Sequence, residues 1–400
     1  MSYNEVKLAE VASYISRGIT PSYTDADGLC VINQKCIRNG SLSLAESRLH
    51  NESKKIVPTD KIVQPMDILV NSTGTGTLGR VAQVTANIRA TVDSHVTIVR
   101  PSKEVDALFL GYAVKWRKPF IEALAEGSTG QTELSRFRLG DEITIPLPSL
   151  VEQQQIAGIL YAIDCQINTN SKINDNLQQQ LCAIFMERFT NNPALESIQQ
   201  VPLSELCSVV TKGTTPTTLG KPFVDRGINF LKAESILDNH SLDKGKFAHI
   251  DEETHDMLKR SVIYAGDIVF TIAGTLGRFA LIDSDILPAN TNQAVAIIRA
   301  DKGRISPEYL YACFIGNWHN DYYSKRVQQA VQANLSLTTI KSLPIPVLTQ
   351  DEMVSYMALI SPIIRMLKQN EMENERLAAL RDTLLPRLMS GEVDVSNIDA

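Results

Sequence analysis

The stretch VKLAEVASYISRGITPS, residues 6–22, returns further along the chain as VPLSELCSVVTKGTTPT, residues 201–217. Further matching segments follow in the same order: GTLGR at 76–80 and 274–278, VTIVR at 96–100 with VAIIR at 295–299, and PLP at 146–148 with PIP at 344–346. Solenoid units run to only about 20 to 50 residues, so a period this long indicates a duplicated domain. Two related domains suggest that two related targets are read.

Length and composition are those of a globular protein with room for two or three domains. The chain has 400 residues, of which 44% are hydrophobic and 21% charged. No run approaches the roughly 18 apolar residues of a membrane span, and the start shows no secretory signal, so we expect the cytoplasm. The cysteines lack metal-ligand spacing and are expected to be reduced and mostly buried: Cys30, Cys36, Cys165, Cys182, Cys207 and Cys313.

The net charge of −6 does not favour nucleic-acid binding. Residues 1–150 carry 17 basic and 16 acidic side chains, and residues 194–347 carry 15 and 16. A domain with this balance must bind DNA through clustered charge, and a more basic partner would be needed to hold the phosphates.

Two long segments have the period of an amphipathic helix. In residues 152–189 the apolar positions recur at spacings of three and four: Ile156, Leu160, Ile163, Ile167, Leu177, Leu181 and Ile184. The pattern repeats at residues 351–390, where Gly391 stands at the position of a helix C-terminal glycine. Pro362 and Pro386 should kink or fray this second helix.

Asparagines interrupt the apolar seam of both helices. A buried asparagine on a coiled-coil seam needs a hydrogen-bonding mate at the same level, so it selects register and partner. We expect the helices to pair antiparallel, with Asn170 near Asn374 and Asn174 near Asn370. In the alternative, each helix packs on its own domain and the asparagines face solvent.

The fold class is therefore mixed α/β (α+β). Two similar target recognition domains are separated by two long antiparallel helices that form a coiled coil with pseudo-twofold symmetry. The predicted segments are a first domain at 1–150, a first helix at 151–193, a second domain at 194–347, a second helix at 348–391 and a C-terminal tail at 392–400.

The segment GTGTLG, residues 74–79, has the glycine spacing of a dinucleotide-binding loop. Such a site needs a helix after the third glycine to hold the pyrophosphate, but residues 80–85 have the pattern of a strand. The second copy also lacks the first glycine. We therefore predict a tight strand-to-strand turn, with Arg80 and Arg278 near a phosphate. The sequence contains no recognisable catalytic constellation and no expected metal site.

Polar loops occupy equivalent places in the two copies, whereas the segments around them repeat. Arg, Lys, Asn and Gln suit base edges, and Ser, Thr and Tyr suit phosphates. The candidate DNA-binding residues in the first copy are Arg17, Thr20, Ser22, Tyr23, Gln34, Lys35, Arg80, Thr129 and Gln131. Those in the second are Lys212, Thr215, Thr217, Lys221, Lys232, Arg278, Gln328 and Gln332.

The duplication, LPSLVEQQQIAGIL at residues 147–160 and LAALRDTLLPRLMSGEV at residues 377–393 together give the chain a family resemblance. It resembles the DNA specificity subunit of type I restriction-modification systems over essentially its whole length. The chain departs from that pattern where Thr349-Gln350-Asp351-Glu352 replaces Glu152-Gln153-Gln154-Gln155, which puts the partner contact of the second helix in doubt.

The resemblance implies a chain without catalysis of its own that binds double-stranded DNA. It implies two methyltransferase subunits as partners and, through them, two restriction and translocase subunits. S-adenosylmethionine, ATP and magnesium would bind to those partners, and this chain would bind no cofactor and no membrane. Two alternatives are a stand-alone two-domain DNA-binding regulator and a cofactor enzyme built on the GTGTLG loop.

Overall fold

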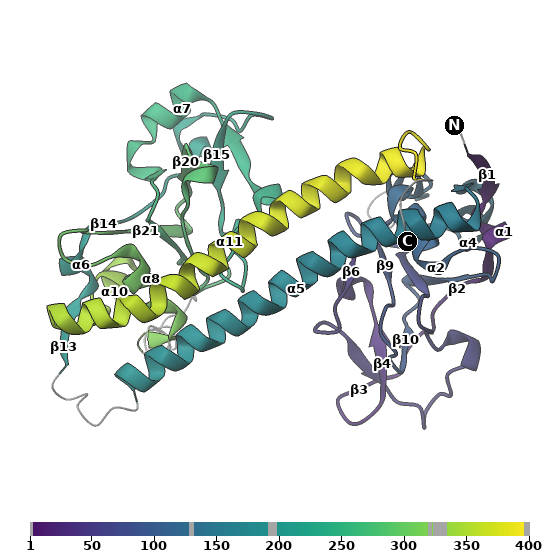
Figure 1. Ribbon diagram of the computed structural model, residues 1–400, viewed down its shortest axis with the longest axis horizontal. Coiled ribbons are helices and arrows are strands. Elements are labelled where there is room, and N and C mark those ends of the chain that lie inside the picture. Colours follow the sequence, from purple (N-terminus) through teal and green to yellow (C-terminus); the bar gives the residue numbers. More distant parts are fainter. Residues whose placement is uncertain (1–2, 128–131, 191–197, 319–321, 323–333, 396–400) are drawn as a thin grey trace. The chain divides into compact units, whose positions relative to one another are not determined.

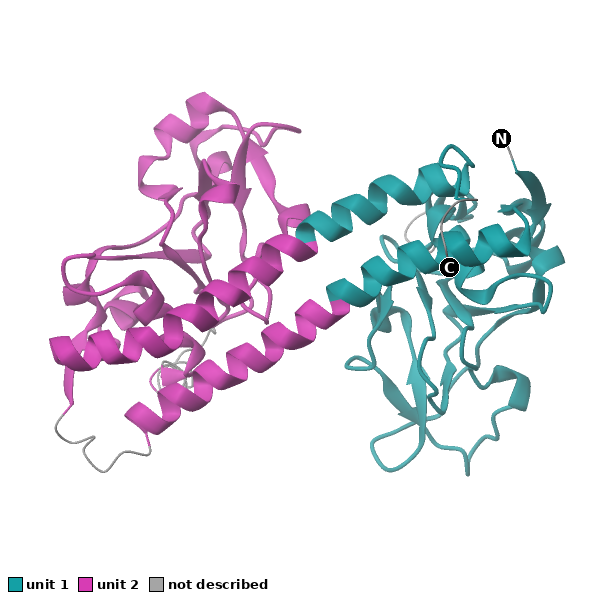
Figure 2. Cartoon of the chain, in the orientation of Figure 1, with its two compact units in different colours: residues 1–167, 375–400 teal, residues 168–374 magenta. Residues whose placement is uncertain are grey.

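The computed structural model describes residues 3–127, 132–190, 198–318, 322 and 334–395. The chain forms two compact units, coloured separately in Figure 2. Unit 1 comprises Met1–Ile167 with Glu375–Ala400, and unit 2 comprises Asn168–Asn374. These units divide both long helices, whereas the segments predicted from the sequence kept each helix whole, because each unit packs against part of both helices.

Each unit has the predicted mixture of short strands and helices (Figure 1). The strands of unit 1 are β1 Asn4–Lys7, β2 Ala12–Arg17, β3 Tyr23–Thr24, β4 Leu29–Ile32, β5 Ile37–Arg38, β6 Ser41–Leu42, β7 Arg48–His50, β8 Ile68–Asn71, β9 Val81–Gln83, β10 Ala90–Val92, β11 Val96–Pro101 and β12 Thr144–Leu147. Its shorter helices are α1 Leu8–Val11, η1 Gln34–Cys36, η2 Thr59–Lys61, α2 Ala107–Trp116, α3 Lys118–Ala123 and α4 Arg136–Glu142.

Unit 2 repeats this order. Its strands are β13 Gln199–Pro202, β14 Cys207–Lys212, β15 Ile228–Leu231, β16 Ala248–Ile250, β17 Val262–Ile263, β18 Ile268–Thr271, β19 Phe279–Leu281, β20 Ala289–Thr291, β21 Val295–Ala300 and β22 Pro344–Val347. Its shorter helices are α6 Leu203–Leu206, η4 Pro216–Leu219, η5 Ala233–Ser235, η6 Lys244–Lys246, α7 Glu252–Met257, η7 Lys259–Ser261, η8 Ser284–Ile286, α8 Pro307–Ile315 and α10 Leu337–Lys341.

The sheets of the two units correspond in most of their strands. One four-stranded antiparallel sheet has the order β2-β11-β8-β9 in unit 1 and β14-β21-β18-β19 in unit 2. The second sheet shares three strands in the same order, β10-β4-β7 in unit 1 and β20-β15-β16 in unit 2, but its fourth strand differs: β3 pairs with β7, whereas β17 pairs with β20. Strands β8 and β18 are buried on both faces, which explains their unbroken apolar runs.

A buried ion pair ties the same strands together in both units. The Asp67 carboxylate accepts hydrogen bonds from Nε and Nη2 of Arg100, both at 2.8 Å. Asp267 and Arg299 form the same bidentate pair at 2.7 Å. Both carboxylates are at most 1% exposed, and each also accepts a backbone N–H three residues upstream. Asp67-Ile68 recurs in the sequence as Asp267-Ile268, and Arg100 and Arg299 end the matching segments VTIVR and VAIIR. These repeated positions are therefore structural.

A glycine at the end of the first long strand explains another repeated position. A Cβ on Gly18 would lie 2.0 Å from the Val92 carbonyl oxygen, and one on Gly213 would lie 2.0 Å from that of Thr291. No larger residue fits without a backbone shift, so both turns need glycine for close packing.

The two long helices are α5, Leu150–Phe189, and α11, Gln350–Met389, each of 40 residues. These bounds confirm both predicted helices. Helix α11 runs through Pro362 and Pro386 without a break. At its end the N–H of Gly391 (φ 73°) donates to the Leu388 carbonyl and that of Glu392 donates to the Arg387 carbonyl. This is a Schellman motif, as the glycine predicts.

Both long helices begin with the same capping box. The Ser149 hydroxyl and N–H donate to Glu152 at 2.6 and 2.9 Å, and those of Thr349 donate to Glu352 at 2.7 and 3.1 Å. Thr349-Gln350-Asp351-Glu352 thus corresponds to Ser149-Leu150-Val151-Glu152. The expected correspondence with Glu152-Gln153-Gln154-Gln155 was wrong by three residues, because Glu352 takes the place of Glu152 in the shared capping pattern.

Each unit builds its core on segments of both long helices. The core of unit 1 includes Ile156 and Leu160 of α5 and Leu388 and Met389 of α11. The core of unit 2 includes four residues of each helix: Leu177, Leu181, Phe185 and Phe189 of α5, and Tyr356, Ile360, Ile364 and Leu367 of α11. Within each unit, apolar burial therefore fixes one segment of each long helix.

The expected asparagine pairs are present within unit 2. Asn170 Nδ2 donates to Asn374 Oδ1 at 3.0 Å, and Asn370 Nδ2 donates to Asn174 Oδ1 at 2.8 Å. Asn170 is 3% exposed. The partner's number falls as the first number rises, so the segments run antiparallel. The alternative with solvent-facing asparagines does not describe this pair.

Replacing Asp67 by alanine should lower the free energy of unfolding of unit 1 by about 3 to 5 kcal/mol, because Arg100 loses its buried partner. The two tryptophans lie one in each unit, Trp116 and Trp318. Urea denaturation followed by fluorescence in a Trp318→Phe background therefore reports unit 1. Asp27→Ala, at an exposed position, is the control; equal losses in both variants would contradict a structural role for the pair.

Replacing Asn170 by alanine should destabilise unit 2 by about 1 to 3 kcal/mol, because the half-buried Asn374 loses the donor of its Oδ1. The double variant Asn170→Leu/Asn374→Leu should lose less than the sum of the single leucine variants, since an apolar pair leaves neither amide unsatisfied. Urea denaturation in a Trp116→Phe background measures all of these. Additive losses would show that the two asparagines do not act as a pair.

Candidate nucleic-acid interface

The GTGTLG segment connects β8 to β9, which are antiparallel neighbours. This confirms the predicted strand-to-strand turn and excludes the strand-turn-helix arrangement of a dinucleotide site. Arg80 Nη2 donates to the Gly76 carbonyl within the turn at 2.8 Å. In the shorter turn of unit 2, Arg278 forms a bidentate pair with Asp238 at 2.6 and 2.8 Å.

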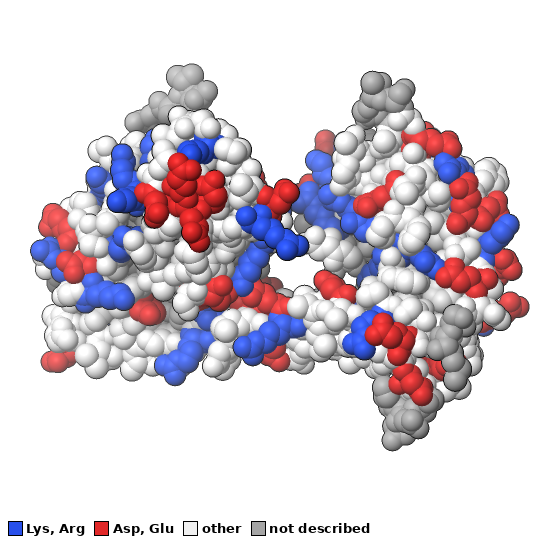
Figure 3. Space-filling view, turned by 90° about the horizontal axis from the view of Figure 1, so that it is seen from above, with Lys and Arg blue, Asp and Glu red and all other residues white. Residues whose placement is uncertain are grey.

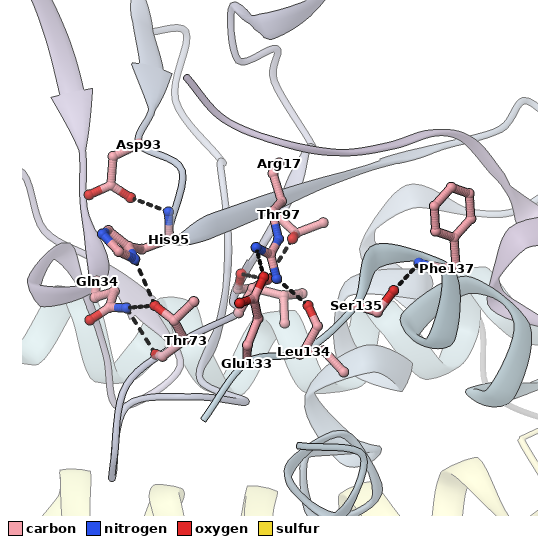
Figure 4. Close-up of polar contacts among 12 residues, drawn as sticks. Arg17, Gln34, Thr73, Asp93, His95, Thr97, Glu133, Leu134, Ser135 and Phe137 are labelled. Atoms are coloured by element: carbon pink, nitrogen blue, oxygen red, sulfur yellow. Dashed lines mark hydrogen bonds and ion pairs between the residues drawn. The ribbon is translucent and has the colours of Figure 1, made fainter. Parts of the chain in front are cut away.

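Arg17 lies at the end of β2, and its side chain contacts other residues of unit 1 (Figure 4). Its guanidinium forms an ion pair with Glu133 and donates to the Leu134 carbonyl at 2.5 Å. These contacts anchor the chain directly after residues 128–131. Arg17 therefore holds Glu133 and Leu134 in place, and its side chain is only partly available to DNA.

Gln34 links the loop after β4 to the turn after β8. Its Nε2 donates to the backbone carbonyl of Thr73 at 2.9 Å and to the Thr73 hydroxyl, which also bonds Nδ1 of His95 at 2.8 Å (Figure 4). In unit 2, Ala233 corresponds to Gln34, at an offset of 199 residues, and Ala273 corresponds to Thr73, at an offset of 200 residues. Both partners of this link are therefore different in the second copy.

Several candidates of unit 1 surround one open hollow of about 440 Å³. Its lining residues come from β3, from η1 and the residue before it, from the start of β7 and the segment before it, and from the turn between β10 and β11: Tyr23, Asn33, Gln34, Lys35, Ala45, Glu46, Ser47, Arg48, Asp93 and His95. Three of these, Tyr23, Gln34 and Lys35, were predicted from the sequence. Thr20 is exposed and Ser22 half-buried on the preceding turn, outside this lining.

The sequence analysis missed Arg48, Glu46, Asp93 and His95. The Arg48 guanidinium lies 3.5 Å from the centre of the Tyr23 ring, a close cation–π contact. Burial raises the pKa of the Asp93 carboxyl, which also accepts the His95 N–H at 2.9 Å (Figure 4). None of these residues lies in a repeated motif, so no local pattern distinguished them.

In unit 2 the candidates are spread over several contacts. Lys221 pairs with Glu253 at 2.7 Å, and the Thr215 hydroxyl bonds Gln293. Lys232 Nζ lies 4.7 Å from the centre of the Phe223 ring. Lys212 and Thr217 are exposed.

Four candidates lie outside the described residues: Thr129, Gln131, Gln328 and Gln332. Their contribution to DNA binding stays a prediction.

Basic and acidic side chains are mixed on the face of each unit drawn in Figure 3. This fits the nearly equal numbers of basic and acidic residues counted in each domain. Ion pairs within a unit, such as that of Arg278 with Asp238, neutralise part of the positive charge. Within the described residues, no cluster of His, Cys, Asp or Glu could hold a metal ion. In the same part of the chain, no helix is long and apolar enough to span a membrane. None of the six cysteines forms a disulfide. Cys36 and Cys313 are buried and the other four are half-buried, so the expectation that most are buried was wrong.

Comparison with known proteins gives one consistent family. The curated MjaVIII specificity subunit of a type I restriction enzyme from Methanocaldococcus jannaschii is 23% identical over 322 residues, covering 76% of this chain and 74% of that protein. The HindI specificity subunit from Haemophilus influenzae is 21% identical over 384 residues, covering 76% and 81%.

A solved structure shares the fold. The S subunit of a type I restriction-modification system from M. genitalium superposes with a TM-score of 0.53 at 18% identity, covering 97% of this chain and 96% of that one. The family described as the type I restriction modification DNA specificity domain matches residues 2–179 and again residues 196–375. Because these two matches cover most of its length, the chain belongs to the type I restriction modification DNA specificity family and carries the family's domain twice.

Proposed function

We propose that this chain is the non-catalytic DNA-reading subunit of a type I restriction-modification complex, in which each unit reads one half of a bipartite site. This proposal is supported by the four-stranded antiparallel sheet of the same order and the buried Asp–Arg pair that both units share, while the loops of the two units differ. Equal scaffolds with unequal loops suit the reading of two different sequences.

The two long helices would set the distance between the half-sites. A straight helix of this length extends about 60 Å at 1.5 Å per residue, which exceeds the roughly 34 Å of one DNA turn. Since the asparagine pairs select one register of α5 against α11, the spacing would be a property of the helices, and the spacer bases would not be read.

The same helices would recruit two methyltransferase subunits and, through them, two restriction and translocase subunits in the cytoplasm. S-adenosylmethionine, ATP and magnesium would bind to those partner subunits. The charge balance supports this division, because a chain with 39 basic and 45 acidic residues has little excess charge for phosphates. Binding by the isolated chain should be weak and salt-sensitive, with a log-log salt slope of about 0.9 per phosphate contact.

Exchange of residues 1–148 for the same region of another family member should change one half of the methylated motif and leave the other half and the spacer unchanged. The exchange ends before the capping Ser149 and therefore keeps both long helices. The measurement is methylome sequencing of a host that carries the chimaera with its methyltransferase. A host with the parental chain and one with no chain are the controls.

Two outcomes would contradict the proposal. A methylome that is the same with and without the chain would reject a role in directing methylation. A chimaera that changes both half-sites would show that reading is not divided between the units. Tight sequence-specific binding by the purified chain alone would favour a stand-alone regulator.

A further inference from the structure

Both units carry a cation on an aromatic ring at the same place in the fold. Tyr23 begins β3, whose next residue Thr24 pairs with Leu49. In unit 2 the residue that corresponds to Thr24 is Val224, which bridges His249, so Phe223 corresponds to Tyr23. The cation over Tyr23 is Arg48, and the cation over Phe223 is Lys232.

The two cations come from different positions. Arg48 starts β7, and strand pairing places Ala248 at its position in unit 2. Lys232 follows β15, where unit 1 has Asn33 after β4. The aromatic platform is therefore common to both units, while the group that it orients is particular to each. That is the arrangement expected of a residue that determines specificity.

The contact with Tyr23 prepares Arg48 to bind a planar acceptor edge. The central carbon of the guanidinium lies 3.5 Å from the ring centre, so the ring limits its rotation, and the N–H groups lie at the rim of the planar guanidinium. These rim groups are the ones that bind O6 and N7 of guanine in the major groove. Arg48 is exposed, so a DNA edge can reach it.

The other charges of the hollow disfavour a phosphate. Lys35 and Arg48 supply donors, but Glu46 and Asp93 line the same space. Two carboxyl groups would oppose a phosphate, whereas they can accept the amino group of cytosine. A G·C base pair presents both kinds of group on one edge: acceptors on guanine and a donor on cytosine.

We propose that the hollow of unit 1 reads one G·C base pair, with Arg48 on guanine and Glu46 on cytosine. This assignment rests on the proposed function and adds the residues and the base pair to it. In unit 2, Ala233, Glu234 and Ala248 replace Gln34, Lys35 and Arg48, so the second half-site is read by different groups.

The test is methylome sequencing of hosts carrying the full complex with Arg48→Ala, Arg48→Lys or Glu46→Ala. Arg48→Ala should reduce discrimination at one G·C position of the half-site assigned to unit 1 by about 5- to 150-fold. Arg48→Lys should restore only part of it, because the bidentate geometry is lost. Glu46→Ala should relax the same position and keeps the backbone carbonyl that Asn33 binds. The matched control is Arg38→Ala, an exposed arginine that does not line the hollow.

Thermal denaturation of each purified variant complex checks that folding is unchanged. An unchanged motif with Arg48→Ala would overturn the base-pair assignment but not the proposed function. A uniform loss of methylation at an unchanged motif would have the same meaning, because it indicates a phosphate contact. A relaxed position in the other half-site would also overturn the base-pair assignment. A parental chain that directs no bipartite motif would reject the proposed function and this assignment together.

Discussion

The buried Asp–Arg pair is the interaction on which each reading unit depends. Asp67 and Arg100 join β8 to β11, and the Arg100 side chain also donates to the Ile62 carbonyl at 3.1 Å. Asp267 and Arg299 make the same contacts in unit 2, with the Val262 carbonyl at 3.2 Å. Buried charges tolerate little change, because loss of one partner leaves the other uncompensated. The turns attached to these strands carry no such constraint, and they are the parts that differ between the copies.

The long helices impose a second constraint of a different kind. Apolar side chains bind α5 and α11 to both cores, but burial alone does not select one register over another. Asn170 paired with Asn374, and Asn370 paired with Asn174, provide that selection. Adding 200 to Asn170 gives Asn370, and subtracting 200 from Asn374 gives Asn174. One hydrogen bond is therefore the repeat of the other, and the duplication extends into the way the helices pair.

Features with a regular period or a local signature were predictable from the sequence. The helices, the strand-to-strand turn and the C-terminal glycine follow from patterns that a few neighbouring residues express. The site was less predictable because its contacts join distant positions. Arg17 meets Glu133 across more than a hundred residues, and Arg278 meets Asp238. The positive charges of Arg17 and Arg278 suggested DNA binding, but each arginine forms an ion pair with a carboxylate of its own unit. Arg48 has no motif around it, and only the pairing of β3 with β7 brings it over Tyr23.

The electrostatics of the chain connect these observations. A reading unit that neutralises its own arginines cannot obtain affinity from phosphates, which supply most of the non-specific binding of DNA-binding proteins. Base readout depends instead on a few oriented groups, and mixed charges in one hollow suit a base-pair edge better than a phosphate. A unit built in this way discriminates more strongly than it binds. Such a division would suit the proposed complex, in which partner subunits would hold the DNA backbone, because a basic reading unit would retain DNA of any sequence.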